Sequence, residues 1–105
     1  MTIRQFDVFG NPLRGSREQR PYVLVIQHAL WDRLPTRVVM PLVVKSALEF
    51  QPRLNPMFEI RGQRLHLSPT EPFALPIRHL REAAQNLSRE RDRIVAALDL
   101  VFTGI

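Results

Sequence analysis

Cysteine is absent from the 105 residues of this sequence. The absence excludes disulfide bridges, thiolate metal sites and thiol nucleophiles, and it is in keeping with a reducing compartment. Glycine is also scarce, and its four residues stand far apart. The sequence therefore has neither a glycine-rich loop for binding phosphates nor a nucleophile elbow, which excludes several classes of enzyme.

Long apolar runs are missing as well. No stretch approaches the roughly 20 apolar residues of a membrane-spanning helix, and the first residues lack the apolar segment of a signal peptide. We therefore expect a cytoplasmic protein without a membrane partner. A chain of this length fits one domain, which we place at residues 1–105.

Acidic residues are outnumbered, with ten Asp and Glu against fifteen Lys and Arg and a net charge of +5. Such a balance indicates either an anionic partner or a merely solvated basic surface. Arg14, Arg17 and Arg20 lie in one polar stretch between two strand-like runs. Because the arginine fork pairs bidentately with carboxylate or phosphate oxygens, this stretch is a candidate site for an acidic peptide. A solvated loop is the alternative.

The three histidines, His28, His66 and His79, lack the spacing and the acidic neighbours of a metal site. His66 falls in a strand-like run and has the chemistry of a general base, but no candidate nucleophile lies near it in the sequence. We predict structural or surface roles for all three, with no catalytic residue, no metal and no cofactor.

Strand-like runs dominate the first three quarters of the chain. Residues 5–9 alternate apolar and polar residues and residues 22–26 form a β-branched run, which predicts a hairpin with a long polar loop. Residues 37–44 form another such run, but Pro41 lacks an N–H donor and so favours an edge strand or a bulge. Residues 57–60 and 64–67 flank Gly62, which is typical of a tight hairpin turn.

Helical periodicity begins near the end of the chain. Apolar residues from Leu87 onward recur at helical spacing, Ser88 is a candidate N-cap, and Gly104 is placed to end the helix. Docking of that helix accounts for Val101 and Phe102. The spacing of apolar residues within residues 77–84, behind a proline, also suggests a short preceding helix.

Two apolar features need a further explanation. Trp31, the sole tryptophan, follows Leu30 and precedes a polar boundary, so it is either a core residue or a partly exposed anchor for a partner. The chain also finishes with Gly104 and Ile105, an apolar side chain beside a free carboxylate. Docking of the helix does not explain this ending.

Several segments resemble the CcdB family of toxins, whose members open with a Gln-Phe-x-Val strand, carry Pro-Leu after an apolar strand and end in Phe-Trp-Gly-Ile. The matching segments are residues 5–8, 37–42, 54–56 and the helix that ends in residues 102–105. They occur in the family order at nearly the family spacing. The resemblance therefore spans essentially the whole chain.

The resemblance implies a mainly β fold with a C-terminal α-helix. Its core is an antiparallel sheet of the SH3-like barrel type that CcdB shares with the MazF ribonucleases, accompanied by a small second sheet. It also implies a homodimer, in which the two C-terminal tails lie close together at the dimer axis.

The function that the resemblance implies is that of a toxin in a type II toxin–antitoxin system. Such a toxin binds the A subunit of DNA gyrase and traps the cleaved-DNA complex, so it acts by binding and is not an enzyme. A CcdA-like antitoxin with an acidic, disordered C-terminal segment neutralises it, and DNA is contacted only through the toxin–antitoxin complex. Carried over by position, the gyrase-binding residues are Leu30, Trp31, Thr103, Gly104 and Ile105.

The antitoxin-binding residues are matched only by chemistry, since Arg14, Arg17 and Arg20 suit an acidic segment. The main departure is Thr103, because the family has at this position a tryptophan that stacks on an arginine of gyrase. We hypothesise that Trp31 supplies the missing ring. The alternatives are a non-toxic family member that binds only the antitoxin, and a MazF-like endoribonuclease that uses arginine with a hydroxyl or carboxylate.

Overall fold

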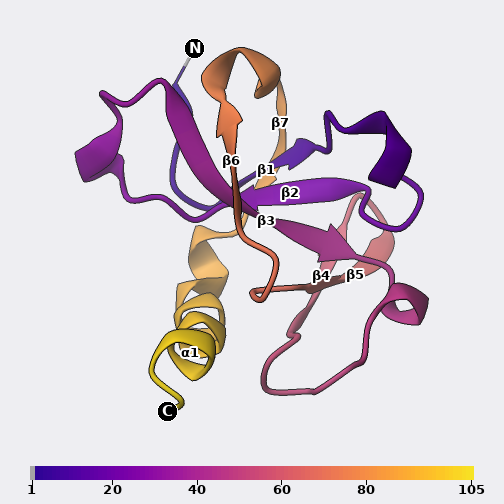
Figure 1. Ribbon diagram of the computed structural model, residues 1–105. Coiled ribbons are helices and arrows are strands. Elements are labelled where there is room, and N and C mark those ends of the chain that lie inside the picture. Colours follow the sequence, from indigo (N-terminus) through magenta and orange to yellow (C-terminus); the bar gives the residue numbers. More distant parts are fainter. Residues whose placement is uncertain (1) are drawn as a thin grey trace.

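The computed structural model describes residues 2–105, which form an antiparallel seven-stranded sheet and a C-terminal helix (Figure 1). The strand order is β4-β5-β3-β2-β1-β7, and β6 pairs with β3. The mainly β fold with a terminal helix is as predicted. The elements are β1 (Asp7–Gly10), β2 (Tyr22–Val25), β3 (Thr36–Val43), β4 (Met57–Ile60), β5 (Gln63–Leu67), β6 (Phe73–Pro76), β7 (Ala83–Asn86) and α1 (Arg91–Phe102).

The predicted first hairpin is formed by β1 and β2, with Val8 opposite Leu24. Its long connection, which we call the arginine loop (residues 11–21), is organised by the buried side chain of Asn11. The Asn11 amide donates to Arg20 O (2.8 Å) and its Oδ1 accepts from Leu13 N (2.9 Å). An amide that satisfies backbone groups in this way fixes a loop that lacks regular pairing.

The second predicted hairpin is formed by β4 and β5, which pair from Met57–His66 to Ile60–Gln63. Its two turn residues, Arg61 and Gly62, both have positive φ, at 48° and 81°. Positive φ at both central residues is the mark of the type I′ turn, whose twist matches that of the strands. This hairpin continues from β3 through two residue pairs, so the small second sheet implied by the resemblance is joined to the main sheet.

Pro41 lies in the central strand, and the prediction of an edge position or bulge is wrong. Strand β3 pairs with β2 in continuous register, with Pro41 opposite Val23, and with β6 and then β5 on its other side. The Pro41 carbonyl accepts from Ser68 N (3.0 Å), on the side where β3 changes partner. In an antiparallel sheet, the N–H and C=O groups of one residue point toward the same neighbouring strand. The N–H that Pro41 lacks would therefore point to the side where β3 changes partner, between its pairing with β6 and its pairing with β5.

The sheet is nearly closed, because side chains bridge its two edge strands. Gln85 of β7 donates to Glu59 O of β4 (3.0 Å), and Arg93 of α1 donates to Met57 O (2.9 Å). The Arg93 guanidinium also lies over the Phe58 ring, 4.7 Å from its centroid. Free carbonyls of the edge strand are thereby covered, which limits pairing with other chains.

Apolar side chains fill both faces of β3. Met40 packs in a cluster with the helix residues Ile94 and Ala97, whereas its neighbour Val39 packs in a second cluster on the opposite face, with Leu75 and others. Burial on both faces explains why β3 reads as a continuous apolar run and not as an alternating one. Burial of apolar area, at about 25 cal/mol per Å², is the main favourable contribution to folding, and these clusters are where it occurs.

The short helix expected over residues 77–84 is replaced by a 3-10 turn (Ile77–His79) and the strand β7. Strand β7 pairs with β1 at the edge of the sheet, with Asn86 opposite Asp7, and this pairing overrides the local helical spacing. The prediction of Ser88 as the N-cap is also wrong. Ser88 lies in a 3-10 turn (Ser88–Glu90) before α1, and its N–H donates to Asn86 Oδ1 (2.8 Å).

Candidate functional site

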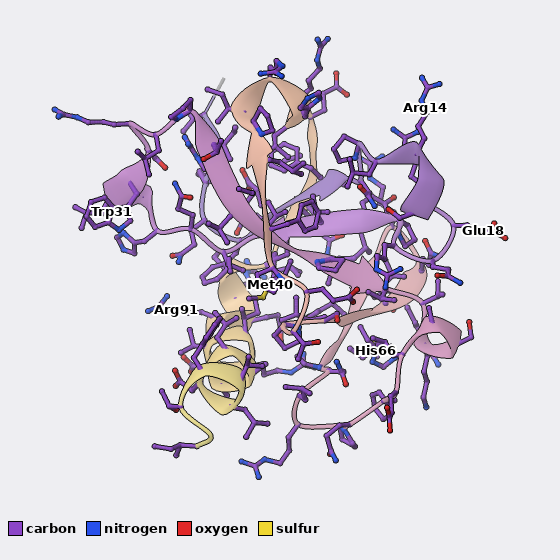
Figure 2. All side chains as sticks on the ribbon, in the orientation of Figure 1. Arg14, Glu18, Trp31, Met40, His66 and Arg91 are labelled. Carbon is purple, nitrogen blue, oxygen red and sulfur yellow. The ribbon has the colours of Figure 1, made fainter. Side chains whose placement is uncertain are left out.

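The connection between β2 and β3 exposes three large apolar side chains, which we call the Trp31 platform. Leu30 is 71 % exposed, Trp31 57 % and Leu34 49 %. Figure 2 shows Trp31 directed away from the body of the protein. Trp31 is therefore exposed and not a core residue, and exposed aromatic clusters of this kind are typical of interaction surfaces.

The backbone of the Trp31 platform is fixed by Arg37, a buried residue of β3 that is 5 % exposed. Its guanidinium donates to three backbone carbonyls that follow Trp31 in the chain: Leu34 O (2.8 Å), Thr36 O (3.0 Å) and Asp32 O (3.1 Å). Hydrogen bonds from a charged donor are stronger than neutral ones. One buried side chain therefore holds the second half of the loop.

Two further side chains hold the first half of the same loop. Gln27 donates to Trp31 O (3.1 Å) and accepts from Val38 N (3.0 Å), which ties the loop to β3. The Nδ1 atom of His28 accepts from Leu30 N (3.0 Å) and caps the 3-10 turn Ala29–Trp31. The apolar side chains are exposed while their backbone is tied on both sides.

The C-terminal tail, residues 102–105, is a compact turn built on one carbonyl. Asp99 O accepts from Thr103 N (2.8 Å), Thr103 Oγ1 (2.7 Å) and Gly104 N (3.1 Å). Gly104 has φ +76°, the left-handed conformation that ends helices, so its predicted role as the stop of the helix is confirmed. Because its hydroxyl is engaged with Asp99, Thr103 presents mainly its methyl group to solvent.

Phe102 is exposed, although docking of the helix was expected to bury it. It is 66 % exposed and Ile105 is 83 % exposed. The buried positions of α1 are Ile94 and Ala97, one turn apart, which rotates Phe102 away from the sheet. The tail consequently presents two large apolar side chains where sequence reasoning assigned one.

The arginines of the arginine loop differ in whether their guanidinium groups already have partners within the protein. Arg20 pairs with Glu71 (2.7 Å), and Arg17 donates through Nε to Asn11 O. Burial raises the pKa of Glu71, but hydrogen bonds from Ser68 and Arg20 outweigh it and leave this pKa below its ordinary value. Arg14 is exposed, and Figure 2 shows it on the opposite side of the molecule from Trp31.

A family model described as CcdB protein matches residues 5–104 of this sequence. The chain belongs to the CcdB family. Membership supports a gyrase-targeting toxin of a toxin–antitoxin system in general, and such toxins are poisons of gyrase and not enzymes. The family also implies dimers and antitoxin partners in general. Among curated proteins, none matches this chain.

The residues assigned from the CcdB resemblance form two separate sets within one protomer. Leu30 and Trp31 lie on the turn between β2 and β3, and Thr103, Gly104 and Ile105 lie past the end of α1. Among the described residues, 2–105, no hydrogen bond joins the two sets.

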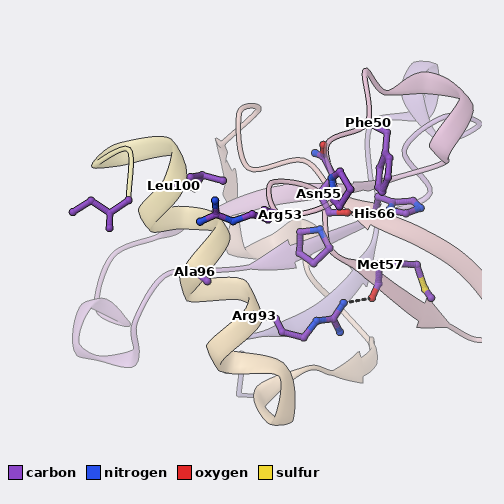
Figure 3. A pocket seen from close by; sticks show the side chains of 11 residues that line it. Phe50, Arg53, Asn55, Met57, His66, Arg93, Ala96 and Leu100 are labelled. Carbon is purple, nitrogen blue, oxygen red and sulfur yellow. Dashed lines mark hydrogen bonds between the residues drawn. The ribbon is translucent and has the colours of Figure 1, made fainter.

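A cavity of about 430 Å³ lies between α1 and the segment before β4 of this CcdB protein (Figure 3). Its apolar walls include Phe50, Met57 and Leu100, and two arginines, Arg53 and Arg93, also line it. The tail residue Ile105 is part of the lining as well. A molecule bound there would therefore contact the tail.

Two of the three histidines make structural contacts through their side chains. His66 is buried, with its Nδ1 atom 3.0 Å from Asn55 O, and His28 caps a turn. Within residues 2–105, no cluster of His, Asp and Glu has the arrangement of a metal site. In the same part of the chain, no helix is long and apolar enough to cross a bilayer.

Sequence reasoning missed three participants in the site: Leu34, Phe102 and Arg37. Leu34 carries a signal, since it is a leucine within the polar segment 32–36. Arg37 carries none, because an arginine at the start of a strand-like run looks like one more surface charge. Only its burial and its three carbonyl partners reveal its place.

Proposed function

We propose that this CcdB-family protein is a homodimeric toxin that binds the A subunit of DNA gyrase through the C-terminal tails and the Trp31 platform. The observation that carries the proposal is the exposure of Trp31 at 57 % on a loop that hydrogen bonds hold on both sides. An exposed aromatic ring on a fixed backbone binds a partner at little cost in conformational entropy. Binding a transient gyrase–DNA state shifts its population toward the cleaved form.

The aromatic contact is the part of this proposal that departs from the family ending. Thr103 provides no ring, and its hydroxyl is already bonded to Asp99 O (2.7 Å). Trp31 is the better replacement for the missing tryptophan, because tryptophan is the strongest cation–π partner for an arginine. Phe102, which is 66 % exposed, offers a second ring at the start of the tail.

A homodimer would bring these two separate sets of residues together. At the end of β3 next to the Trp31 platform, the face of the strand that carries Met40 also exposes Val38, which is 37 % exposed and lies opposite Ala74. A two-fold axis doubles every such patch and matches the symmetry of a dimeric target. Dimerisation through this face would cover Val38 and set the two tails about one axis.

The antitoxin in this proposal is a CcdA-like protein whose acidic, disordered segment binds at the arginine loop. Arg14 is fully available, and Arg17 retains its two Nη groups beside the bond from Nε to Asn11 O. Arg20 is a weaker candidate, because its guanidinium is paired with Glu71. DNA would be contacted only through the toxin–antitoxin complex.

A gyrase cleavage assay with purified protein tests the proposal. The wild-type protein is expected to stabilise the cleaved DNA complex, Trp31→Ala to lose this effect, and Thr103→Trp to strengthen it. Harmless protein that binds an antitoxin tightly would point to the non-toxic alternative. Cleavage of RNA by the same preparation would point to the MazF-like alternative.

A further inference from the structure

We infer that Arg37 is the positioning residue of the Trp31 platform, and that it holds the loop in the conformation that a partner recognises. The identity of that partner rests on the proposed function, in which it is gyrase. The role of Arg37 rests on its own contacts, which are independent of the partner.

The guanidinium of Arg37 spans the whole second half of the loop. Its Nη1 atom donates to Leu34 O (2.8 Å) and Thr36 O (3.0 Å), and its Nη2 atom donates to Asp32 O (3.1 Å). Three carbonyls in five residues are therefore turned inward toward one planar group. The side chain of Leu34 is left pointing outward, 49 % exposed.

The buried charge of Arg37 and the shape of the loop depend on each other. Burying a cation is unfavourable unless its charge is compensated. The carboxylate of Asp32 compensates only in part, because Oδ1 is 3.6 Å from Nε, its side chain is 40 % exposed and Nε has no hydrogen-bond partner. The carbonyl dipoles of the loop supply the rest of the compensation. Any rearrangement of the loop would therefore leave the buried Arg37 cation uncompensated.

This dependence favours a role in loop order over a role in stability. An apolar side chain at a core position packs at no electrostatic cost, and replacement of buried charges by apolar groups is often neutral or stabilising. Gln27 adds the complementary tie by donating to Trp31 O (3.1 Å) from the other side of the turn. Between them, Arg37 and Gln27 fix the main chain from the carbonyl of Trp31 onward.

The sole tryptophan of the chain makes the inference directly measurable. Time-resolved fluorescence anisotropy of Trp31 reports the mobility of the loop, and the affinity for gyrase reports its function. The variants are Arg37→Met, which keeps the stem, and Arg37→Lys, which keeps the charge but not the planar fork. Asn86→Ala is the control, because the Asn86 side chain also ties the backbone, donating to Gln5 O (3.1 Å), in a different part of the sheet.

Both Arg37 variants are expected to show faster and larger local motion of Trp31. They should also lose affinity for gyrase by about tenfold, the equivalent of one to two lost hydrogen bonds. Asn86→Ala should leave both quantities unchanged even where it lowers the melting temperature. If Arg37→Met does not fold, Arg37→Lys and Gln27→Met still decide, since neither one leaves a buried position without a polar group.

Unchanged Trp31 anisotropy in folded Arg37 variants would overturn the inference, whatever happens to binding. A loss of affinity that merely follows the unfolded fraction, in step with the Asn86→Ala control, would overturn it as well. If the wild-type protein does not bind gyrase, the proposed function fails while the anisotropy measurement still decides the role of Arg37.

Discussion

The Nδ1 atom of His66 lies 3.0 Å from the backbone carbonyl oxygen of Asn55. Because a carbonyl only accepts, Nδ1 carries the proton in this contact. The Asn55 side chain is bonded in turn to Leu67 O (3.0 Å) and to Gln51 N (2.9 Å). Together these bonds fasten the segment before β4, which forms one wall of the cavity beside α1, to strand β5.

Asn55→Ala is expected to loosen this segment. Asn55 is only 3 % exposed, so the substitution leaves the Leu67 carbonyl and the Gln51 amide without their partner. The expected loss in the free energy of unfolding is about 1–3 kcal/mol. Urea denaturation measures it, and Gln51→Ala, which removes no bonded side-chain atom, serves as the control. Equal stability of Asn55→Ala and wild type would contradict this role for Asn55.

Glu71→Gln is expected to change how stability depends on pH. The folded protein holds the pKa of Glu71 below its ordinary value, so the ionised carboxylate stabilises the fold above the pKa of the unfolded chain. That contribution is lost as the pH falls through the lower, folded pKa. The deficit of Glu71→Gln relative to wild type should therefore be largest near neutral pH and shrink in acid.

The size of this deficit should be modest, because the pair with Arg20 is partly exposed, at 28 % and 36 % for the two side chains. Exposed pairs contribute about 0–1 kcal/mol, to which the Ser68 hydroxyl adds a charge-assisted bond of 2.6 Å. Chemical denaturation at a series of pH values measures the curve. A deficit that grows toward low pH would have the wrong sign.

The elements that the sequence predicted correctly are those whose residue patterns act locally. Gly62 marks a turn because two positive φ angles are needed there, and Gly104 ends α1 for the same reason, at φ +76°. The hairpins of residues 7–25 and 57–67 followed from runs of apolar and β-branched residues bounded by turn residues. In each case the residues that determine the local structure lie within about ten positions of one another.

The predictions that were wrong depend on contacts between residues far apart in the sequence. Pro41 sits in the central strand because β3 changes partner beside it, and that change involves residues more than twenty positions away. Strand β7 forms where helical spacing was read, because β1, at the other end of the chain, offers an edge. Arg37 is missed for a similar reason, since its partners appear only once the loop has folded back on it.

Trp31→Ala is expected to abolish or greatly weaken gyrase poisoning while leaving the fold intact. The ring is 57 % exposed and belongs to neither core cluster, so its removal should change the free energy of unfolding by less than about 1 kcal/mol. Loss of a cation–π and apolar anchor costs about 2 kcal/mol or more of binding, which is at least tenfold in affinity.

Trp31→Phe keeps a ring and should retain part of the effect, whereas Phe102→Ala tests the second exposed ring at the start of the tail. Gyrase cleavage and calorimetric binding provide the two measurements. Full activity of Trp31→Ala together with inactivity of Phe102→Ala would show that the tail, and not the Trp31 platform, makes the aromatic contact with gyrase.

Gly104→Ala tests whether the shape of the tail matters apart from its composition. A Cβ at this position meets no atom within 4 Å, so the only penalty is the left-handed backbone at φ +76°. That penalty is about 1 kcal/mol and falls on the last turn of the chain, so the melting temperature should hardly change. The alanine variant instead favours a different direction for Ile105, and poisoning should fall. A D-alanine at position 104, introduced by semisynthesis, prefers positive φ and should restore activity, which a role for side-chain size alone would not allow.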